Sequence, residues 1–202
     1  YIPTFVKNEK GELVAIKWDY NAYGEKFTGL LKDNQVWQEI NQGLKINTIE
    51  PGMLLEAGGI EVNGNGVLLT TEQCLLKRNP NLSKQDYEDA FVKYLGISKV
   101  IWLKKGLVND HTDGHIDELA KFVAPNKIVC AYEEDKGDEN YQILEENYQA
   151  LKNSTDASGK PFEVIKLPMP HMTYDDGNKA PVSYVNFYIG NKFQLTKYSS
   201  TQ

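Results

Sequence analysis

The chain has 202 residues, of which 41% are hydrophobic, 11% aromatic and 25% charged, a composition typical of a globular protein with one sizeable core. Its net charge of −6 argues against a general nucleic-acid binder, because such proteins carry a basic stripe and Lys and Arg occur here in runs no longer than pairs. No run of 18 apolar residues predicts a transmembrane helix, and no signal peptide is recognised.

The first third of the chain predicts two strands, a helix and a third strand. We expect the first two strands over residues 3–7 and 13–18, joined by a tight turn. A helix follows over residues 33–44, where Val36, Trp37 and Ile40 recur at helical spacing. The last strand of this part belongs within residues 46–55.

The middle of the chain predicts the same order of elements. Strands over 59–62 and 67–71 flank Asn-Gly-Asn-Gly, a strong hairpin signal because Asn and Gly tolerate positive φ. Ser83 and Asp86 form a capping-box pattern at the start of a helix over 84–95, which Gly96 ends. A strand over 100–103 follows.

The last third repeats the order again. The sequence predicts strands over 119–123 and 128–132, a helix over 139–152 and a strand over 162–167. A further strand over 182–189 would open a fourth copy.

These copies predict an α/β fold built of ββαβ repeats arranged as a propeller around an axis. The repeats span about 1–55, 56–103 and 113–167, with the start of a fourth at 182–191, all within a single incomplete domain over 1–202. Glu56 precedes the first strand of the second repeat, and His115 and Asp117 precede that of the third. Equivalent positions in such units converge near the axis, so we expect these side chains to share a site.

Residues 109–118 hold two of the three histidines and four carboxylates. Histidine transfers protons near neutral pH, and a neighbouring carboxylate can orient it or bind a cationic substrate. One interpretation is a metal site, because His111, Asp113, His115 and Asp117 would face one side of an extended strand and could ligate zinc. Gly114 argues against a regular strand there.

Six segments together indicate a family. They are Trp-Asp-Tyr-Asn-Ala-Tyr-Gly at 18–24, Leu-Glu-Ala-Gly-Gly-Ile-Glu-Val at 55–62, Leu-Leu-Thr-Thr-Glu-Gln-Cys-Leu-Leu at 68–76, Thr-Asp-Gly-His-Ile-Asp at 112–117, Leu-Pro-Met-Pro at 167–170, and Ser-Tyr-Val-Asn-Phe-Tyr-Ile at 183–189. In this order they resemble the agmatine deiminase family, also called the Porphyromonas-type peptidylarginine deiminase family. The resemblance implies the pentein fold, a five-bladed α/β propeller, of which this chain would hold about three units.

The resemblance also implies a mechanism. A cysteine thiolate attacks the guanidinium carbon, ammonia leaves, and water hydrolyses the covalent intermediate. His115 would be the general acid and base, Glu56 would pair with it, and Asp117 would hold the guanidinium group. Asp113 would contact substrate, although turn formation beside Gly114 explains it equally well.

For the whole protein, the resemblance implies a hydrolase that converts agmatine, a small cationic guanidinium substrate, to N-carbamoylputrescine and ammonia, a step toward putrescine. It implies no metal or organic cofactor, a cytoplasmic location without nucleic-acid or membrane partners, and a possible homodimer. The alternatives are deimination of peptidyl-arginine and a catalytically inactive truncated fragment.

The chain departs from the family pattern in three ways. The family nucleophile lies in a Gly-rich segment near the C-terminus, and neither Cys74 nor Cys130 has that context. A second guanidinium-binding aspartate, expected just before residues 2–6, is absent, and His111 stands where the family usually has Asp. The chain therefore resembles the middle of a deiminase, and we expect it to be inactive alone.

Several residues have simpler interpretations. Cys130, in an apolar run, is expected to be a buried small hydrophobe, and both cysteines fit a reducing cytoplasm. Glu56 could instead be a strand-edge carboxylate satisfied by the Gly58 and Gly59 amides. His171 is expected in an exposed loop. Core or rim positions are expected for three aromatic residues, Trp18, Tyr20 and Tyr23.

Overall fold

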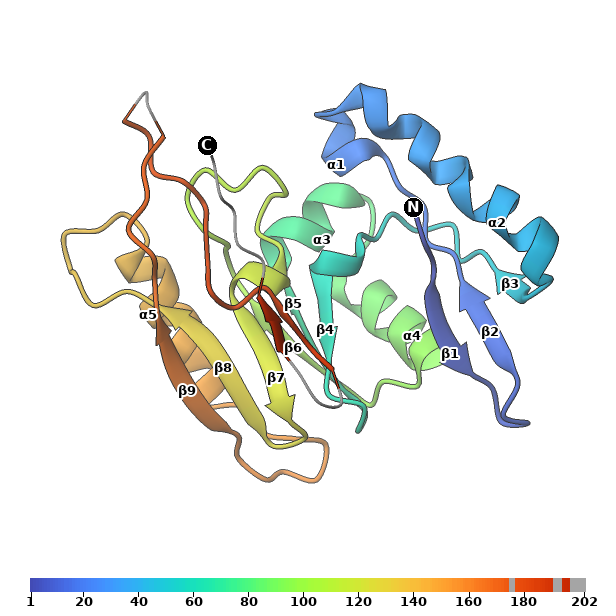
Figure 1. Ribbon diagram of the computed structural model, residues 1–202. Coiled ribbons are helices and arrows are strands. Elements are labelled where there is room, and N and C mark those ends of the chain that lie inside the picture. Colours follow the sequence, from blue (N-terminus) through green and yellow to red (C-terminus); the bar gives the residue numbers. More distant parts are fainter. Residues whose placement is uncertain (175–176, 191–193, 197–202) are drawn as a thin grey trace. The chain divides into compact units, whose positions relative to one another are not determined.

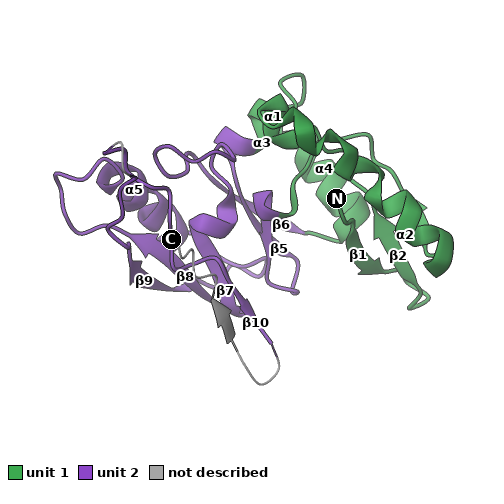
Figure 2. Ribbon diagram, turned by 45° about the horizontal axis from the view of Figure 1, so that its top comes forward, with its two compact units in different colours: residues 1–57, 75–97 green, residues 58–74, 98–202 purple. Residues whose placement is uncertain are grey.

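A computed structural model of the protein describes residues 1–174, 177–190 and 194–196 (Figure 1). The chain divides into two compact units (Figure 2). Unit 1 comprises Tyr1–Ala57 and Leu75–Ile97, and unit 2 comprises Gly58–Cys74 and the chain from Ser98 onward. Neither unit is one continuous segment, so the chain passes between them three times.

Unit 1 contains a three-stranded sheet of β1 (Thr4–Lys7), β2 (Leu13–Ile16) and β3 (Asn47–Ile49). β1 pairs antiparallel with β2, and β2 pairs parallel with β3. Asn8 forms the turn between the first two strands, because its side-chain oxygen accepts hydrogen bonds from two amides of the turn at 3.0 and 2.9 Å. The strands predicted for this part are confirmed, with shorter bounds.

The helix predicted over residues 33–44 is only partly correct. Residues Thr28–Gln35 form a 3₁₀ helix, and α2 follows at Val36–Leu44. The 3₁₀ segment buries no side chain, so no packing favours a regular α-helix there. In α2, Trp37 is buried, makes an edge contact with Phe5 and donates a hydrogen bond to Thr48.

α4 (Lys84–Leu95) starts and ends as predicted. Ser83 and Asp86 form the reciprocal capping box, and Gly96 has φ +66° after the last turn. α4 belongs to unit 1, where Phe91 and Tyr94 make edge contacts with the buried Trp18 ring.

The turn labelled α1 (Ala22–Glu25) was not predicted. All four of its residues have positive φ, between 55° and 75°, so it is a left-handed turn, in which three non-glycine residues are strained. The Asn21 side chain accepts the Gly24 amide hydrogen bond at 2.9 Å. Tyr20, before this turn, is buried, and Tyr23 is half-buried. Together with Trp18, these positions confirm the core or rim interpretation.

Unit 2 contains two sheets with the same strand order as the sheet of unit 1. The first has β4 (Ile60–Val62), β5 (Val67–Thr71) and β6 (Lys99–Leu103); the second has β7 (Ala120–Ala124), β8 (Lys127–Tyr132) and β9 (Glu163–Pro168). In each sheet the first two strands are antiparallel and the last two are parallel. The predicted mixed α/β class and the ββαβ order are thus confirmed, whereas the number of propeller units and the single-domain organisation stay predictions.

One hydrophobic cluster forms the core of unit 2. α5 (Tyr141–Lys152) contributes Leu144 and Leu151, which pack with β8 residues such as Ile128 and with Phe162 before β9. Each of these side chains is at most 8% exposed. Cys130 lies in the same cluster, and its burial raises the pKa of the thiol to about 12. The interpretation of Cys130 as a small hydrophobe is confirmed.

The sequence-based prediction missed or misplaced three shorter elements. α3 (Glu72–Arg78) was not predicted. The strand predicted over 182–189 reduces to β10 (Phe187–Ile189), paired with β11 (Gln194–Thr196), because residues 180–187 form tight turns with hydrogen bonds from Val182 to Ala180 and from Phe187 to Val185. Residue 191 of the predicted fourth copy lies outside the described residues. Within the described part of the chain, every helix is too short or too polar to cross a membrane.

Candidate active site

The loop that carries the two neighbouring histidines is organised by Asp110. Its carboxylate accepts hydrogen bonds from the amides of Thr112, Gly114 and His115, at 2.8, 2.7 and 3.1 Å. The Thr112 hydroxyl donates to the same carboxylate at 2.7 Å. A single side chain therefore fixes the backbone that leads into His115.

Close backbone packing anchors this loop at Gly114. A Cβ added to Gly106 would lie 2.1 Å from the Gly114 Cα, and Gly114 itself has φ +89°, so glycine is required at both positions. The Gly114 carbonyl accepts a hydrogen bond from the Thr71 hydroxyl at 2.6 Å. The Gly106 amide donates to the Gln73 side chain at 3.0 Å. The loop is thus tied to the end of β5 and the start of α3.

His115 and Asp117 lie side by side in unit 2. The His115 residue is 6% exposed, and its Nδ1 lies 3.8 Å from Asp117 Oδ1. Gly58 packs against both, because a Cβ there would lie 2.5 Å from His115 Nδ1 and 2.6 Å from Asp117 Oδ2. The Asp117 side chain is 27% exposed and accepts a hydrogen bond from Asn186 at 3.3 Å. A reachable carboxylate suits the binding of a cation, and a buried imidazole beside it suits proton transfer during a reaction of that ligand.

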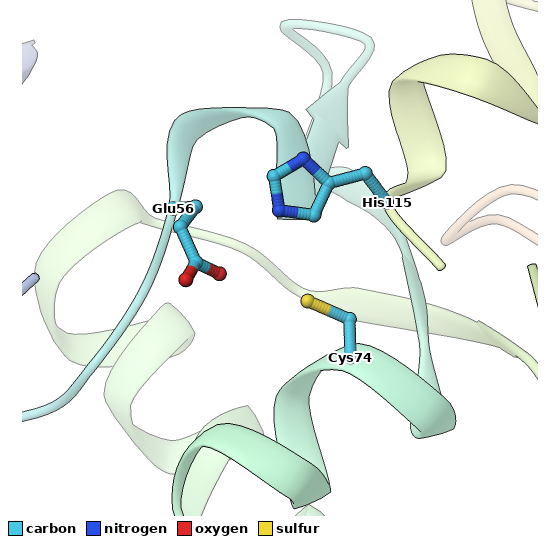
Figure 3. Close-up of side chains that lie close together, drawn as sticks. All are labelled: Glu56, Cys74 and His115. Carbon is cyan, nitrogen blue, oxygen red and sulfur yellow. The ribbon is translucent and has the colours of Figure 1, made fainter. Parts of the chain in front are cut away.

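Cys74 lies near His115 (Figure 3), a proximity that the sequence did not predict. Its Sγ and a ring nitrogen of His115 lie within 4.8 Å of each other, and both residues belong to unit 2. Cys74 is fully buried, and its amide donates to the Thr71 hydroxyl at 3.1 Å. A thiol so enclosed cannot reach a substrate from solvent.

Glu56, in unit 1, forms an ion pair with Arg78. The Arg78 Nε donates to Glu56 Oε1 at 2.5 Å, and the two side chains are 0% and 4% exposed. Burial first, and then the charge of Glu56, raise the pKa of Tyr1, whose hydroxyl donates to the Leu55 carbonyl. Sequence reasoning missed Arg78, although a signal existed: it is the single arginine of the chain, at the end of a predominantly apolar segment.

The structure contradicts the strand on which the zinc interpretation depended. Residues 109–115 form turns, with Asp113 at φ +66°, and residues Ile116–Glu118 form a 3₁₀ helix. Among the described residues, His111, Asp113, His115 and Asp117 do not form a common cluster of metal ligands. The positive φ of Asp113 and Gly114 breaks the two-residue alternation that would have aligned the four side chains. Asp113 is buried at this turn.

Comparisons with known proteins identify the family to which this chain is similar. The sequence pattern of the family described as Porphyromonas-type peptidyl-arginine deiminase matches residues 1–200. A curated protein of Legionella pneumophila (strain Paris) is 40% identical over 191 residues, which cover 94% of this chain and 55% of that protein. The chain therefore spans little more than half the length of this relative.

Several of the similar solved structures carry the name agmatine deiminase. The substrate-bound enzyme of C. jejuni is 33% identical, with a TM-score of 0.83, and the match covers 94% of this chain and 56% of that one. The enzyme of Enterococcus faecalis is also 33% identical, with a TM-score of 0.82, and the match covers 96% of this chain and 60% of that one. The matched family pattern, the shared fold and the ordered motifs lead to one conclusion: this chain belongs to the Porphyromonas-type peptidyl-arginine deiminase family.

Proposed function

We propose that the complete protein to which this chain contributes is a hydrolase that deiminates a guanidinium group, with agmatine as the substrate. The products would be N-carbamoylputrescine and ammonia. The observation that carries the proposal is the buried His115 imidazole 3.8 Å from the partly exposed Asp117 carboxylate, on a loop fixed by Asp110 and Gly114. Membership of the family and the solved agmatine deiminases at 33% identity support the choice of chemistry and substrate.

His115 would be the general acid and base of the reaction. A thiolate would attack the guanidinium carbon, and ammonia would leave with a proton from the His115 imidazolium. The imidazole would then take a proton from the water that cleaves the carbon–sulfur bond. We assign the thiolate to a cysteine outside this chain, because Cys74 and Cys130 are both buried and neither lies in a Gly-rich segment.

Asp117, Glu56 and Asp113 would support this histidine and the substrate. Asp117 would bind the guanidinium nitrogens by charge-assisted hydrogen bonds. Its side chain is 27% exposed, so a ligand can reach the carboxylate. Glu56 would be the carboxylate partner of His115, a role that rests on the resemblance to the family. Asp113 would contribute to substrate binding from its buried turn.

A second substrate class is favoured by one specific observation. The description of the matched family names peptidyl-arginine deiminase. Arginine at a peptide terminus is therefore the alternative substrate to agmatine. A small pocket would accept agmatine and exclude a peptide, whereas an open pocket would accept both.

The remaining expectations concern the setting of the reaction. We propose a cytoplasmic enzyme of putrescine and polyamine synthesis, a location that suits the two cysteines, which form no disulfide. A homodimer is proposed by resemblance alone. The chain without its nucleophile would be inactive.

The test is turnover by the gene product with the sequences that flank this chain, compared with the chain alone. Formation of ammonia and N-carbamoylputrescine from agmatine, and of ammonia and a citrulline residue in a peptide with terminal arginine, would be measured for both. We expect the longer protein to convert agmatine, and His115→Ala and Asp117→Asn to reduce turnover by at least about 100-fold. Glu134→Gln, a change at an exposed carboxylate, is the control. Full activity of His115→Ala in a folded protein would refute its role.

A further inference from the structure

A second cluster of potential ligands lies in unit 2, away from the residues assigned above. Glu133 follows β8, Asp138 lies in the turn before α5, and His171 follows β9. One carboxylate oxygen from each acid and one imidazole nitrogen all lie within 4.8 Å of one another. The proposed deimination chemistry uses none of these three residues.

Glu133 is the unusual member of this cluster, because it is buried and incompletely satisfied. The residue is 3% exposed, and its Oε1 accepts a hydrogen bond from the Asp135 amide at 3.0 Å. Its Oε2 has no hydrogen-bond partner among the described residues. The nearest cluster nitrogen, His171 Nδ1, is 4.0 Å away, too far for a hydrogen bond. A buried carboxylate oxygen without a donor is costly, so such an atom indicates a missing cation.

The charges around the cluster leave a negative excess. Asp138 accepts hydrogen bonds from Lys179 and from the Asn140 amide. Lys179 therefore balances Asp138, whereas the ion pair found for Glu133 among the described residues is with His171, at 4.0 Å.

We propose that Glu133, Asp138 and His171 bind a divalent transition-metal ion, with Zn²⁺ as the best match. One imidazole nitrogen and two carboxylate oxygens are a ligand set that zinc accepts, whereas Ca²⁺ and Mg²⁺ prefer oxygen ligands alone. Because the His171 side chain is 71% exposed, solvent can supply the fourth ligand. The imidazole can turn onto the ion at little cost.

A metal here would connect three parts of unit 2. His171 belongs to a hairpin in which Thr173 pairs with Lys179, and the Lys179 carbonyl accepts a hydrogen bond from Asn109 at 3.1 Å. The Asn140 side chain accepts the Val108 amide hydrogen bond at 2.8 Å. The ion would therefore fix the hairpin against the end of β8 and the start of α5, next to the loop that leads to His115.

The experiment is a calorimetric titration of the metal-stripped 202-residue protein with Zn²⁺, together with the visible absorption of its Co²⁺ form. We expect one ion per chain and an absorption band typical of a nitrogen- and oxygen-ligated Co²⁺. Glu133→Gln, which keeps the shape of the buried side chain, and His171→Ala, at an exposed position, should each raise Kd by at least about 10-fold.

Two matched controls make the result decisive. Glu134→Gln changes the exposed carboxylate next to Glu133, and His111→Ala removes another exposed histidine; both should leave Kd unchanged. Absence of one-to-one binding would overturn the proposal. So would equal binding by His171→Ala and the unsubstituted protein, or a loss of binding in His111→Ala.

Discussion

Replacing Arg78 with methionine should destabilise the protein strongly, because it leaves the buried Glu56 carboxylate without its ion pair. The Nε and Oε1 atoms are 2.5 Å apart, and the side chains are 0% and 4% exposed. At an effective dielectric constant of about 20, charges at that distance attract by roughly 7 kcal/mol, much of which offsets their desolvation. Removing one partner of a buried pair costs about 3–5 kcal/mol, and we expect Arg78→Met to lower the free energy of unfolding by that amount.

Urea denaturation followed by circular dichroism measures this change. Lys77→Met, at the exposed neighbouring position, is the matched control and should cost less than about 0.5 kcal/mol. The double variant Glu56→Gln/Arg78→Met should recover part of the loss, because the buried charge is then gone as well. A cost below about 1 kcal/mol for Arg78→Met, which is the range of surface pairs, would refute the reasoning.

Three further changes test other parts of the structure. Gly58→Ala would place a Cβ 2.5 Å from His115 Nδ1, so we expect a loss of about 1–3 kcal/mol in urea denaturation; Gly43→Ala, in open space on α2, should lose nothing. Ser83→Ala removes the cap of α4 and should cost about 1 kcal/mol in the same assay; an unchanged midpoint would contradict the capping box. The native Cys130 thiol keeps its proton up to a pKa of about 12, whereas the unfolded thiol ionises from its ordinary pKa of 9.0, so stability should fall as pH rises through that window. Unfolding curves at about pH 8 and about pH 10 should show a smaller decline for Cys130→Ala than for the unsubstituted protein, and equal declines would count against a buried, protonated thiol.

Local signals allowed much of the fold to be predicted from the sequence. The Ser83 capping box and the Asn-Gly-Asn-Gly hairpin depend on residues within a few positions of each other, and both are present. The repeated order of elements likewise identified the three sheets of three strands each. The predictions that failed concerned features set by unusual backbone conformations or by contacts between residues distant in the chain. The left-handed α1 turn has no glycine at three of its four positions, so no local rule predicts it.

In the candidate site, too, local proximity was predicted correctly and contacts between distant residues were missed. His115 and Asp117 were predicted to lie close together, and they do. Arg78 was missed because its partner Glu56 is 22 residues away in the chain, and Cys74 because its approach to His115 depends on how β5 and the Gly114 loop meet. The alignment of His111 with Asp113 failed because the Asp113 backbone adopts a positive φ that few non-glycine residues take.

The interleaving of the two units has a consequence for synthesis on the ribosome. When residue 57 has emerged, the three strands of unit 1 are complete, yet the helix that carries Phe91 and Tyr94 is not made, and the Trp18 ring lacks two of its aromatic neighbours. Residues 58–74 of unit 2 emerge before that helix, and they lack their packing partners until the chain beyond Ser98 is synthesised. The nascent chain therefore holds two unfinished cores at once, and no single truncation point yields either unit without residues of the other.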